Sequence, residues 1–373
     1  METISIPTKI FSGTDSLDEL NNISNETVFM VCDSFLPNTE TLKEITGHIN
    51  NTNKLSIFSD VKPDPPLANI IKGVKKYINV KPTVVIGIGG GSAIDTGKAI
   101  RFFGEKILNQ NIKFFTAIPT TSGTGSEVTN TSVISDAETQ RKFPIMDDHL
   151  TPDYALLDPK LVTSAPKSVT AYSGLDVLTH SLESLVARDA NLMTDALAEK
   201  GVDTIVHHLV DCYNDGNDID SRKIVHEASC AAGIAFNTAG LGICHSLAHQ
   251  LGANFHIPHG LANAMLLPYV VSYNASKSDT ALRKYAEATR KAGLASSGMG
   301  DKVAVRHLIS QIQTMMRQMH CPATLDAFGI DQASAVKMTA KIVRDARQDG
   351  TFPGNPVVPT DDDLISIYKQ IIK

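Results

Sequence analysis

Hydrophobic and polar positions follow two different patterns along this chain, and the change falls near residue 160. Before it, short runs rich in β-branched residues end in turn residues such as Gly, Asp and Pro. These runs predict strands over 27–33, 54–60, 82–92 and 112–123. Between them, the segments 67–78 and 93–104 have apolar residues at helical spacing. Strands that alternate with helices pair in parallel, so the first part is predicted to form an open α/β sheet.

Strand patterns nearly disappear in the second part of the chain. Long segments with helical apolar spacing follow one another, beginning with 174–187 and 192–210. They predict an all-helical region. At 373 residues the chain is long enough for two domains. We therefore expect an α/β domain over 1–164 and a helical domain over 165–373, packed together with a cleft between them.

The composition narrows the classes of function. The formal net charge is −6 and the basic residues are scattered, which argues against a nucleic-acid or membrane-surface partner. The five cysteines are widely spaced and include no C-x-x-C pair, as expected for reduced thiols. The first residues lack a signal-peptide pattern, and no apolar run approaches the roughly 20 residues of a membrane span. The sequence thus predicts a cytoplasmic protein with no nucleic-acid or membrane partner.

A glycine-rich turn follows one of the predicted strands. The sequence IGIGGGSAID, residues 86–95, places Gly89, Gly90, Gly91 and Ser92 where a strand gives way to a helix. Glycines let backbone N–H groups approach an anion, and a helix N-terminus adds unpaired donors. Ser92 would either cap this helix or donate to a phosphate. A bare tight turn is the alternative, because the sequence does not match the G-x-G-x-x-G fingerprint of dinucleotide-binding proteins.

A second loop of small residues, TTSGTGSE at 120–127, comes at the end of the last predicted strand. Ligands of open α/β sheets bind at the carboxyl edge of the strands. Two such loops at one edge therefore predict a site for a phosphate-bearing ligand. The acidic residue that the fingerprint requires about 20 residues downstream is missing, so the pattern does not identify the ligand.

Histidines concentrate in one stretch, with four of the twelve between residues 245 and 260. His245 and His249 are four residues apart and share one face of a helix, and His259 follows after a turn. Asp176 and His180 have the same spacing on another predicted helix. Two such helices could bring imidazoles and a carboxylate around zinc or ferrous iron. Taken singly, an Asp-x-x-x-His pair is more often a surface hydrogen bond.

The other histidines have simpler interpretations. His256 is expected to be a polar wall of the cleft rather than a ligand. His207, His208 and His226 are expected to be surface or hydrogen-bonded helix residues. It is the combination of the two spaced pairs with His259 that favours a metal site.

Five segments resemble the signatures of one family, in that family's order. They are GGGSAID (89–95), PTTSGTGSE (119–127), KFPIMDDHLTPDYALLDP (142–159), GLDVLTHSLES (174–184) and GLGICHSLAHQLGANFHIPHGLANAMLLP (240–268). Through them the chain resembles the iron-containing, or group III, alcohol dehydrogenases over essentially its whole length. The stretches IFSG, VCDSFL and IFSDVKPDPP most resemble the propanol dehydrogenases of bacterial propanediol utilisation.

The resemblance implies a dinucleotide-binding α/β domain, a helical metal-binding domain and an active site in the cleft. It implies iron held by four residues, Asp176, His180, His245 and His259. It implies cofactor contacts from two loops and a lysine near the ribose: Gly89, Gly90, Gly91, Ser92, Thr120, Thr121, Thr124 and Lys142.

Asp33 stands where the family places the residue that faces the adenosine ribose. A carboxylate there accepts hydrogen bonds from a 2′-hydroxyl and repels a 2′-phosphate, so NAD(H) is expected rather than NADP(H). Asp64, in the segment KPDPP, stands where the family more often has Asn, which leaves the adenine-side contacts there open.

The implied activity interconverts short primary alcohols and aldehydes, such as 1-propanol and propionaldehyde, by hydride transfer. The metal acts as a Lewis acid on the substrate oxygen. His249 is not needed as a further ligand and is expected to relay the proton, while Phe236 is expected to line the alcohol pocket. The length of the substrate and the choice between iron and zinc stay open.

Two other interpretations are compatible with the sequence. One is a metalloenzyme similar to glycerol dehydrogenase or dehydroquinate synthase, and the other is a non-catalytic microcompartment partner that retains the fold. The His-x(13)-His spacing and the loop PTTSGTGSE favour the alcohol dehydrogenase branch. As partners, the resemblance implies a homodimer or larger assembly and an optional association with a bacterial microcompartment.

Overall fold

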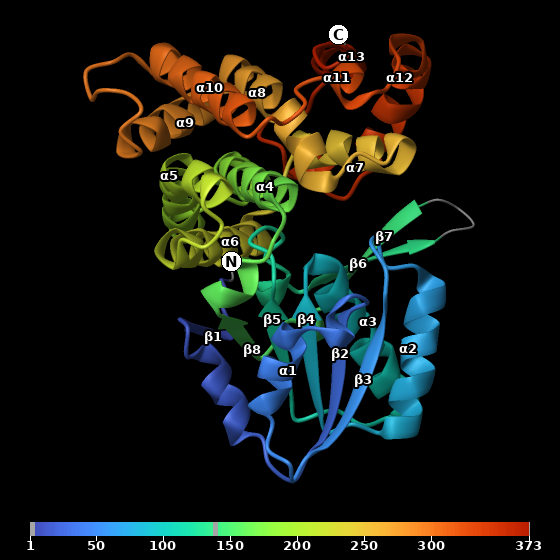
Figure 1. Cartoon of the computed structure of the whole chain (residues 1–373). Helices are drawn as coiled ribbons and strands as arrows, with labels where there is room; N and C mark the ends of the chain where they lie inside the picture. Colours follow the sequence, from blue (N-terminus) through green and yellow to red (C-terminus); the bar gives the residue numbers. More distant parts are fainter. Residues whose placement is uncertain (1–3, 137–140, 373) are drawn as a thin grey trace. The chain divides into compact units, whose positions relative to one another are not determined.

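The computed structural model describes residues 4–136 and 141–372, without the side chains at 136 and 141–143. Contacts divide the chain into two compact units, Met1–Ala165 and Pro166–Lys373 (Figure 1). Two apolar clusters form the core of the first unit, and one large cluster forms the core of the second.

A parallel sheet forms the centre of the first unit. Its strands are β1 (Lys9–Ser12), β2 (Thr27–Asp33), β3 (Lys54–Val61), β4 (Val84–Gly89), β5 (Phe114–Pro119) and β8 (Tyr154–Leu157). They lie in the order β1-β8-β5-β4-β2-β3, and each neighbouring pair is parallel. The predicted open α/β sheet is confirmed, and β8 is a strand that the pattern did not predict.

Helices cover both faces of this sheet: α1 (Glu40–Gly47), α2 (Leu67–Val80) and α3 (Gly91–Leu108). Alternate residues of β2 point to opposite faces. Met30 packs in the core that includes α1, whereas Phe29 and Val31 pack in the core that includes α2 and α3. Because both faces are buried, the strand is continuously apolar rather than alternating.

An antiparallel pair, β6 (Thr131–Asp136) and β7 (Arg141–Met146), lies outside the main sheet. No strand was predicted there. The pair is tied to α3, because Ser132 Oγ donates to the carbonyl of Asp95 at 2.8 Å and Val133 N–H donates to its carboxylate at 2.9 Å. These bonds hold the loop that follows β5 close to the start of α3.

The second unit is helical, as predicted. Its helices are α4 (Lys167–Val186), α5 (Leu192–Asn214), α6 (Ile219–Ala239), α7 (Ile243–Phe255), α8 (His259–Lys277), α9 (Asp279–Lys291), α10 (Asp301–Gln318), α11 (Leu325–Phe328), α12 (Gln332–Arg347) and α13 (Asp361–Lys369). Nearly every residue of α4 from Thr170 onward is buried, so this helix is the central element of the unit.

Among the described residues, no single helix is long and apolar enough to cross a membrane, and one pair, α6 and α7, meets the criterion jointly but is bent by 107° at the break.

Candidate metal centre

Helix α4 carries three ionisable residues within its buried length. Asp176, His180 and Glu183 are 3%, 4% and 2% exposed. Their spacing of four and three residues places them on one face of the helix. Charged groups are stable in a protein interior when they are paired or bind a metal, so this face requires partners from other elements.

Two further helices supply those partners. Helix α7 carries His245 and His249, and α8 begins at His259. Gly260 lets α8 approach α4 closely, since a Cβ at this position would lie 2.0 Å from the backbone oxygen of Tyr172. A side chain there would move His259 away from Asp176.

Four side chains predicted as metal ligands lie together. Asp176, His180, His245 and His259 each offer one ligand atom, and these atoms all lie within 4.8 Å of one another. Nε2 of His245 and Nε2 of His259 are 3.8 and 3.6 Å from Asp176 Oδ1. Three imidazoles and one carboxylate form a donor set that suits iron or zinc. The His259 side chain is 34% exposed, so the set is accessible at this residue.

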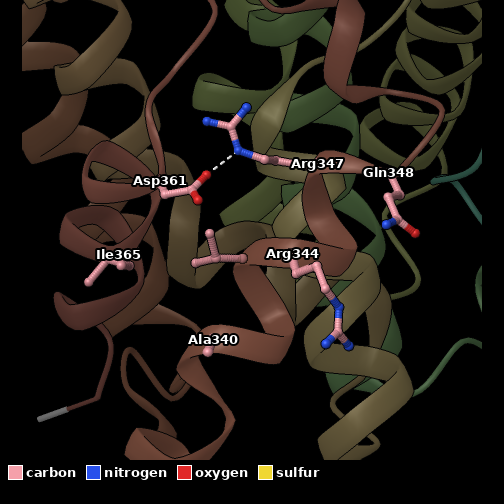
Figure 2. Close-up of a pocket in the computed structure, with 7 residues that line it drawn as sticks. Ala340, Arg344, Arg347, Gln348, Asp361 and Ile365 are labelled. Atoms are coloured by element: carbon pink, nitrogen blue, oxygen red, sulfur yellow. Dashed lines mark hydrogen bonds and ion pairs between the residues drawn. The ribbon is translucent and has the colours of Figure 1, made fainter.

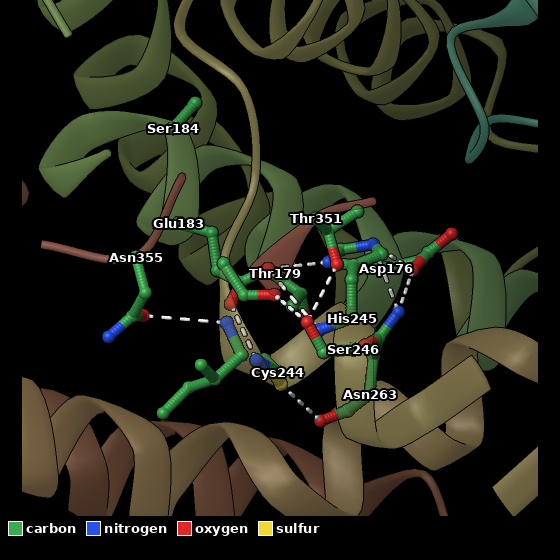
Figure 3. A network of polar contacts seen from close by, with 12 residues as sticks. Asp176, Thr179, Glu183, Ser184, Cys244, His245, Ser246, Asn263, Thr351 and Asn355 are labelled. Carbon is green, nitrogen blue, oxygen red and sulfur yellow. Dashed lines mark hydrogen bonds and ion pairs between the residues drawn. The ribbon is translucent and has the colours of Figure 1, made fainter. Parts of the chain in front are cut away.

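Glu183 was not identified from the sequence, although it lies in the quoted segment GLDVLTHSLES. Its carboxylate accepts from His245 Nδ1 at 2.6 Å and from the N–H of Cys244, at the start of α7, at 2.7 Å (Figure 3). With Nδ1–H donated to Glu183, Nε2 is the nitrogen whose lone pair is available to a metal. Burial lowers the pKa of His245, but Glu183 and Asp176 outweigh this and raise it.

Asn263 is a second polar neighbour that the sequence did not reveal. It is fully buried, one turn after His259 on α8. Its Nδ2 donates to Asp176 Oδ1 at 2.8 Å and lies 3.1 Å from His245 Nε2. This amide therefore orients the carboxylate from the side of α8 (Figure 3).

The remaining predicted residues of this unit lie beside the ligand set. The rings of His249 and His259 are stacked, with centroids 5.3 Å apart. The ring of Phe236 stacks on His180 at 4.4 Å. His256, expected to be a polar wall, is the left-handed C-cap of α7 with φ of 55°, and its N–H donates to the carbonyl of Gly252. It therefore terminates the helix.

The glycine turn of the first unit adjoins the end of a neighbouring strand. Asp33 ends β2, and its Oδ2 accepts from the N–H of Gly90 at 3.0 Å. Gly89 has φ of 138°, and a Cβ there would lie 2.2 Å from Asp33 Oδ2, so this position requires glycine. Burial raises the pKa of the Asp33 carboxyl, and the bond from Gly90 partly offsets the shift.

The loop after β5 packs against the same turn. The N–H of Thr120 donates to the carbonyl of Gly89 at 3.0 Å. A Cβ at Gly90 would lie 3.5 Å from Thr121 Oγ1, and one at Gly91 would lie 2.7 Å from the Thr124 side chain. The two predicted loops thus form one continuous surface of backbone donors and hydroxyls at the start of α3.

Three predictions at this edge have different outcomes. Gly90, not Ser92, is the N-cap of α3, so the capping role suggested for Ser92 is wrong. Lys142 lies in β7, but its side chain is outside the described part of the chain. Asp64 has φ of 48°, a left-handed conformation that Asp and Asn tolerate better than most residues.

A surface hollow between α12 and α13 contains none of these predicted residues (Figure 2). Arg344 and Arg347 line it, and Arg347 pairs with Asp361 across it. The ion pair joins the two helices, so we interpret this hollow as structural.

Comparison with known proteins identifies the family. The family model for iron-containing alcohol dehydrogenase matches residues 7–159, and the model for the C-terminal part of the Fe-containing alcohol dehydrogenase family matches 170–372. The chain belongs to the iron-containing alcohol dehydrogenase family. It is therefore an oxidoreductase of the alcohol–aldehyde class, and NAD(H) and iron are the cofactors that this membership implies.

Relatives of this alcohol dehydrogenase extend over its full length. It is 39% identical to 1-propanol dehydrogenase PduQ of Citrobacter freundii, with 100% of both chains covered. It is 34% identical to NADPH-dependent butanol dehydrogenase of Clostridium saccharobutylicum, covering 100% of this chain and 98% of the relative. A crystal structure of 1,3-propanediol oxidoreductase is 28% identical with a TM-score of 0.92, and both chains are covered completely.

Proposed function

We propose that this alcohol dehydrogenase reduces short aldehydes, such as propionaldehyde, to primary alcohols with NADH, and catalyses the reverse oxidation with NAD. The observation that carries the proposal is the convergence of Asp176, His180, His245 and His259 within 4.8 Å. The full-length similarity to a 1-propanol dehydrogenase supports the choice of substrate.

The four converging residues would hold the metal, with ferrous iron as the expected ion and zinc as the alternative. When bound, the ion supplies Lewis acidity that polarises the substrate oxygen. Glu183 and Asn263 orient His245 and Asp176 through the hydrogen bonds described above. Phe236 contributes an apolar wall beside His180, which suits the alkyl part of a short alcohol.

Proton transfer is assigned to His249. It is not one of the four converging residues, and its ring stacks on that of His259. Its side chain is 30% exposed, so it can exchange protons with solvent as well as with a bound substrate. Imidazole is suited to this task because its ordinary pKa lies near neutrality.

The cofactor is proposed to be NAD(H), bound by the first unit. The residues proposed to contact it are Asp33, Gly89, Gly90, Gly91, Ser92, Thr120, Thr121, Thr124 and Lys142. The Asp33 carboxylate would accept from a ribose 2′-hydroxyl and repel a 2′-phosphate. This choice is not shared by every relative, since one of them is an NADPH-dependent enzyme.

The proposal includes a homodimer or larger assembly in the cytoplasm, with a bacterial microcompartment as the alternative location. Its support is the resemblance of the sequence to the propanol dehydrogenases of propanediol utilisation.

Activity is tested by following NADH oxidation with propionaldehyde. Protein purified without oxygen is divided into chelated, ferrous-restored and zinc-restored samples. Activity restored by ferrous iron alone would support the proposal and its metal. Activity with zinc alone would retain the site and change the metal. An inactive protein that still binds NADH, or one with dehydroquinate synthase or glycerol dehydrogenase activity, would refute the proposed function.

A further inference from the structure

A half-buried carboxylate outside the ligand set lies next to His249. Asp349 follows α12, and its Oδ2 accepts from His249 Nδ1 at 2.8 Å. Its Oδ1 accepts from the N–H and the hydroxyl of Thr351 at 2.9 and 2.8 Å. The Asp349 side chain is 14% exposed. Three hydrogen bonds thus fix the orientation of both carboxylate oxygens and of the imidazole plane.

The segment 349–355 is itself held against the start of α7, the helix that carries His249. Thr351 Oγ1 lies 2.9 Å from Ser246 Oγ, and Asn355 Oδ1 accepts from the N–H of Ile243. A Cβ at Gly354 would lie 2.1 Å from the backbone oxygen of Leu241, so glycine permits this close approach. These contacts hold the chain that follows Asp349 against α7, and so help to place its carboxylate.

We infer that Asp349 is a positioning residue for proton transfer, an inference that rests on the proposed function. Because His249 donates Nδ1–H to Asp349, Nε2 is the nitrogen that exchanges the proton. In aldehyde reduction the hydride from NADH reaches the carbonyl carbon, and the proton on His249 Nε2 goes to the carbonyl oxygen. His249 then recovers a proton from solvent, and Asp349 remains a carboxylate throughout.

The alternative is that Asp349 only holds the 349–355 segment in place. The two roles differ in how the effects of substitutions combine. If Asp349 acts through His249, its substitution has no further effect once His249 is removed. If Asp349 supports the fold, its substitution lowers activity by the same factor in either background.

The test is a double-mutant cycle in the metal-loaded protein, with propionaldehyde and NADH. Asp349→Asn is expected to lower kcat about 10–100-fold, because general acid–base catalysis contributes at least that much. The KM for NADH and the metal content should stay as in the wild type. In the His249→Ala background, Asp349→Asn should change kcat by less than about twofold. Asp345→Asn, on α12 and paired with Lys341, is the matched control and should retain the wild-type kcat.

Equal decreases in both backgrounds, or a wild-type kcat in Asp349→Asn, would overturn the inference and leave the proposed function intact. An unimpaired His249→Ala variant would overturn it as well. A wild-type protein that oxidises no NADH with propionaldehyde would instead refute the proposed function. If Asp349→Asn does not fold, Asp349→Glu, which keeps the charge and shifts the carboxylate by one methylene, must show the same dependence on His249.

Discussion

His245 illustrates how one ring nitrogen of a proposed metal ligand can be fixed by a hydrogen bond from the other. Nδ1 is held by Glu183, and Glu183 also accepts from the N–H of Cys244 at the start of α7. The carboxylate thereby fixes the tautomer and the helix together. Both side chains are nearly inaccessible to water, which makes the hydrogen bond strong and its loss costly. We therefore expect substitution of Glu183 to weaken metal binding, although Glu183 is not one of the four proposed ligands.

Glu183→Gln is expected to weaken metal binding about 10–100-fold, the range found when outer partners of metal ligands are removed. Competition with a chelator of known affinity measures this directly. Glu227→Gln, an exposed carboxylate on α6 that pairs with Lys223, is the matched control. An unchanged affinity in Glu183→Gln would show that the tautomer of His245 is fixed by other means.

Asp33→Ala is expected to reduce the preference for NADH over NADPH. The loss of a charged hydrogen-bond acceptor corresponds to about 1.5–3 kcal/mol, so the ratio of the two kcat/KM values should fall at least about tenfold. Asp60→Ala, at the end of β3 and paired with Lys72, serves as the control. A ratio that stays constant would assign the discrimination to residues other than Asp33.

The sequence could identify some of these residues and not others, for physical reasons. Helical spacing and residue type, together with the family resemblance, predicted Asp176, His180, His245 and His259 as ligands, and the structure places these four side chains together. Glu183 has suitable spacing, but a glutamate on a helix is ordinarily a surface residue. Asp349 is 100 residues from His249, and nothing local to either residue indicates that tertiary packing brings them together.

At the scale of elements, α3 is held to the loop after β5 by buried charges. Lys98 is fully buried and donates to the carbonyl oxygens of Thr129 and Thr131 at 2.8 and 2.9 Å. Asp95 accepts from Ser126 Oγ at 2.5 Å. These bonds keep the threonine loop beside the glycine turn. Burial lowers the pKa of Lys98 to about 8, and Asp95 and Glu127 partly offset the shift.

Lys98 should give the protein a pH-dependent stability. Its folded pKa is below its unfolded value, so the unfolded chain binds more protons between about pH 8 and 10.5, and the free energy of unfolding rises with pH in that window. Relative to Lys98→Met, the wild type should gain on the order of 2–3 kcal/mol between pH 7.5 and 10. Denaturant unfolding of both proteins at the two pH values measures the gain.

Lys106→Met, at an exposed position on the same helix, is the control. Its free energy of unfolding should change between the two pH values by as much as that of the wild type. If the free energies of unfolding of the wild type and Lys98→Met differ by the same amount at both pH values, Lys98 keeps its charge throughout this range.

The pattern of elements was predictable where the elements are long. The strands β2 to β5 and the helices α2 and α3 are long enough for the pattern of their apolar residues to be recognised in the sequence. The strands β1 and β8 have four residues each, too few for an alternation. Ser16 and Glu19 have the spacing of a capping box, which predicts a helix that begins after Ser16. The structure instead has a short 3-10 helix over Ser16–Asn22 with Asp15 as its N-cap.

At the scale of the whole molecule, the two candidate sites belong to separate compact units. The residues proposed to contact the cofactor are in Met1–Ala165, and the proposed metal ligands are in Pro166–Lys373. Each unit has its own apolar core. The change from alternating strands and helices to helices alone was visible in the sequence. The binding of cofactor and of metal should therefore be separable by mutation.

His259→Ala is expected to remove the bound metal and abolish turnover, while the Kd for NADH changes by less than about threefold, a difference under 1 kcal/mol. Elemental analysis and NADH fluorescence measure the two properties in one preparation. His256→Ala should leave the metal content unchanged, because His256 caps α7. Equal metal in His259→Ala and the wild type would refute the assignment of this ligand.

Three of the site's polar residues, Asp176, His180 and Glu183, lie within about two turns of one buried helix. The insertion or deletion of one residue between Asp176 and Glu183 would rotate the flanking side chains by about 100° relative to one another, since a helix has 3.6 residues per turn. Such a change would move at least one of Asp176, His180 and Glu183 off the face of the helix that the other two share. Among homologues descended from this gene, insertions and deletions should therefore occur in the surface loops and not within residues 176–183.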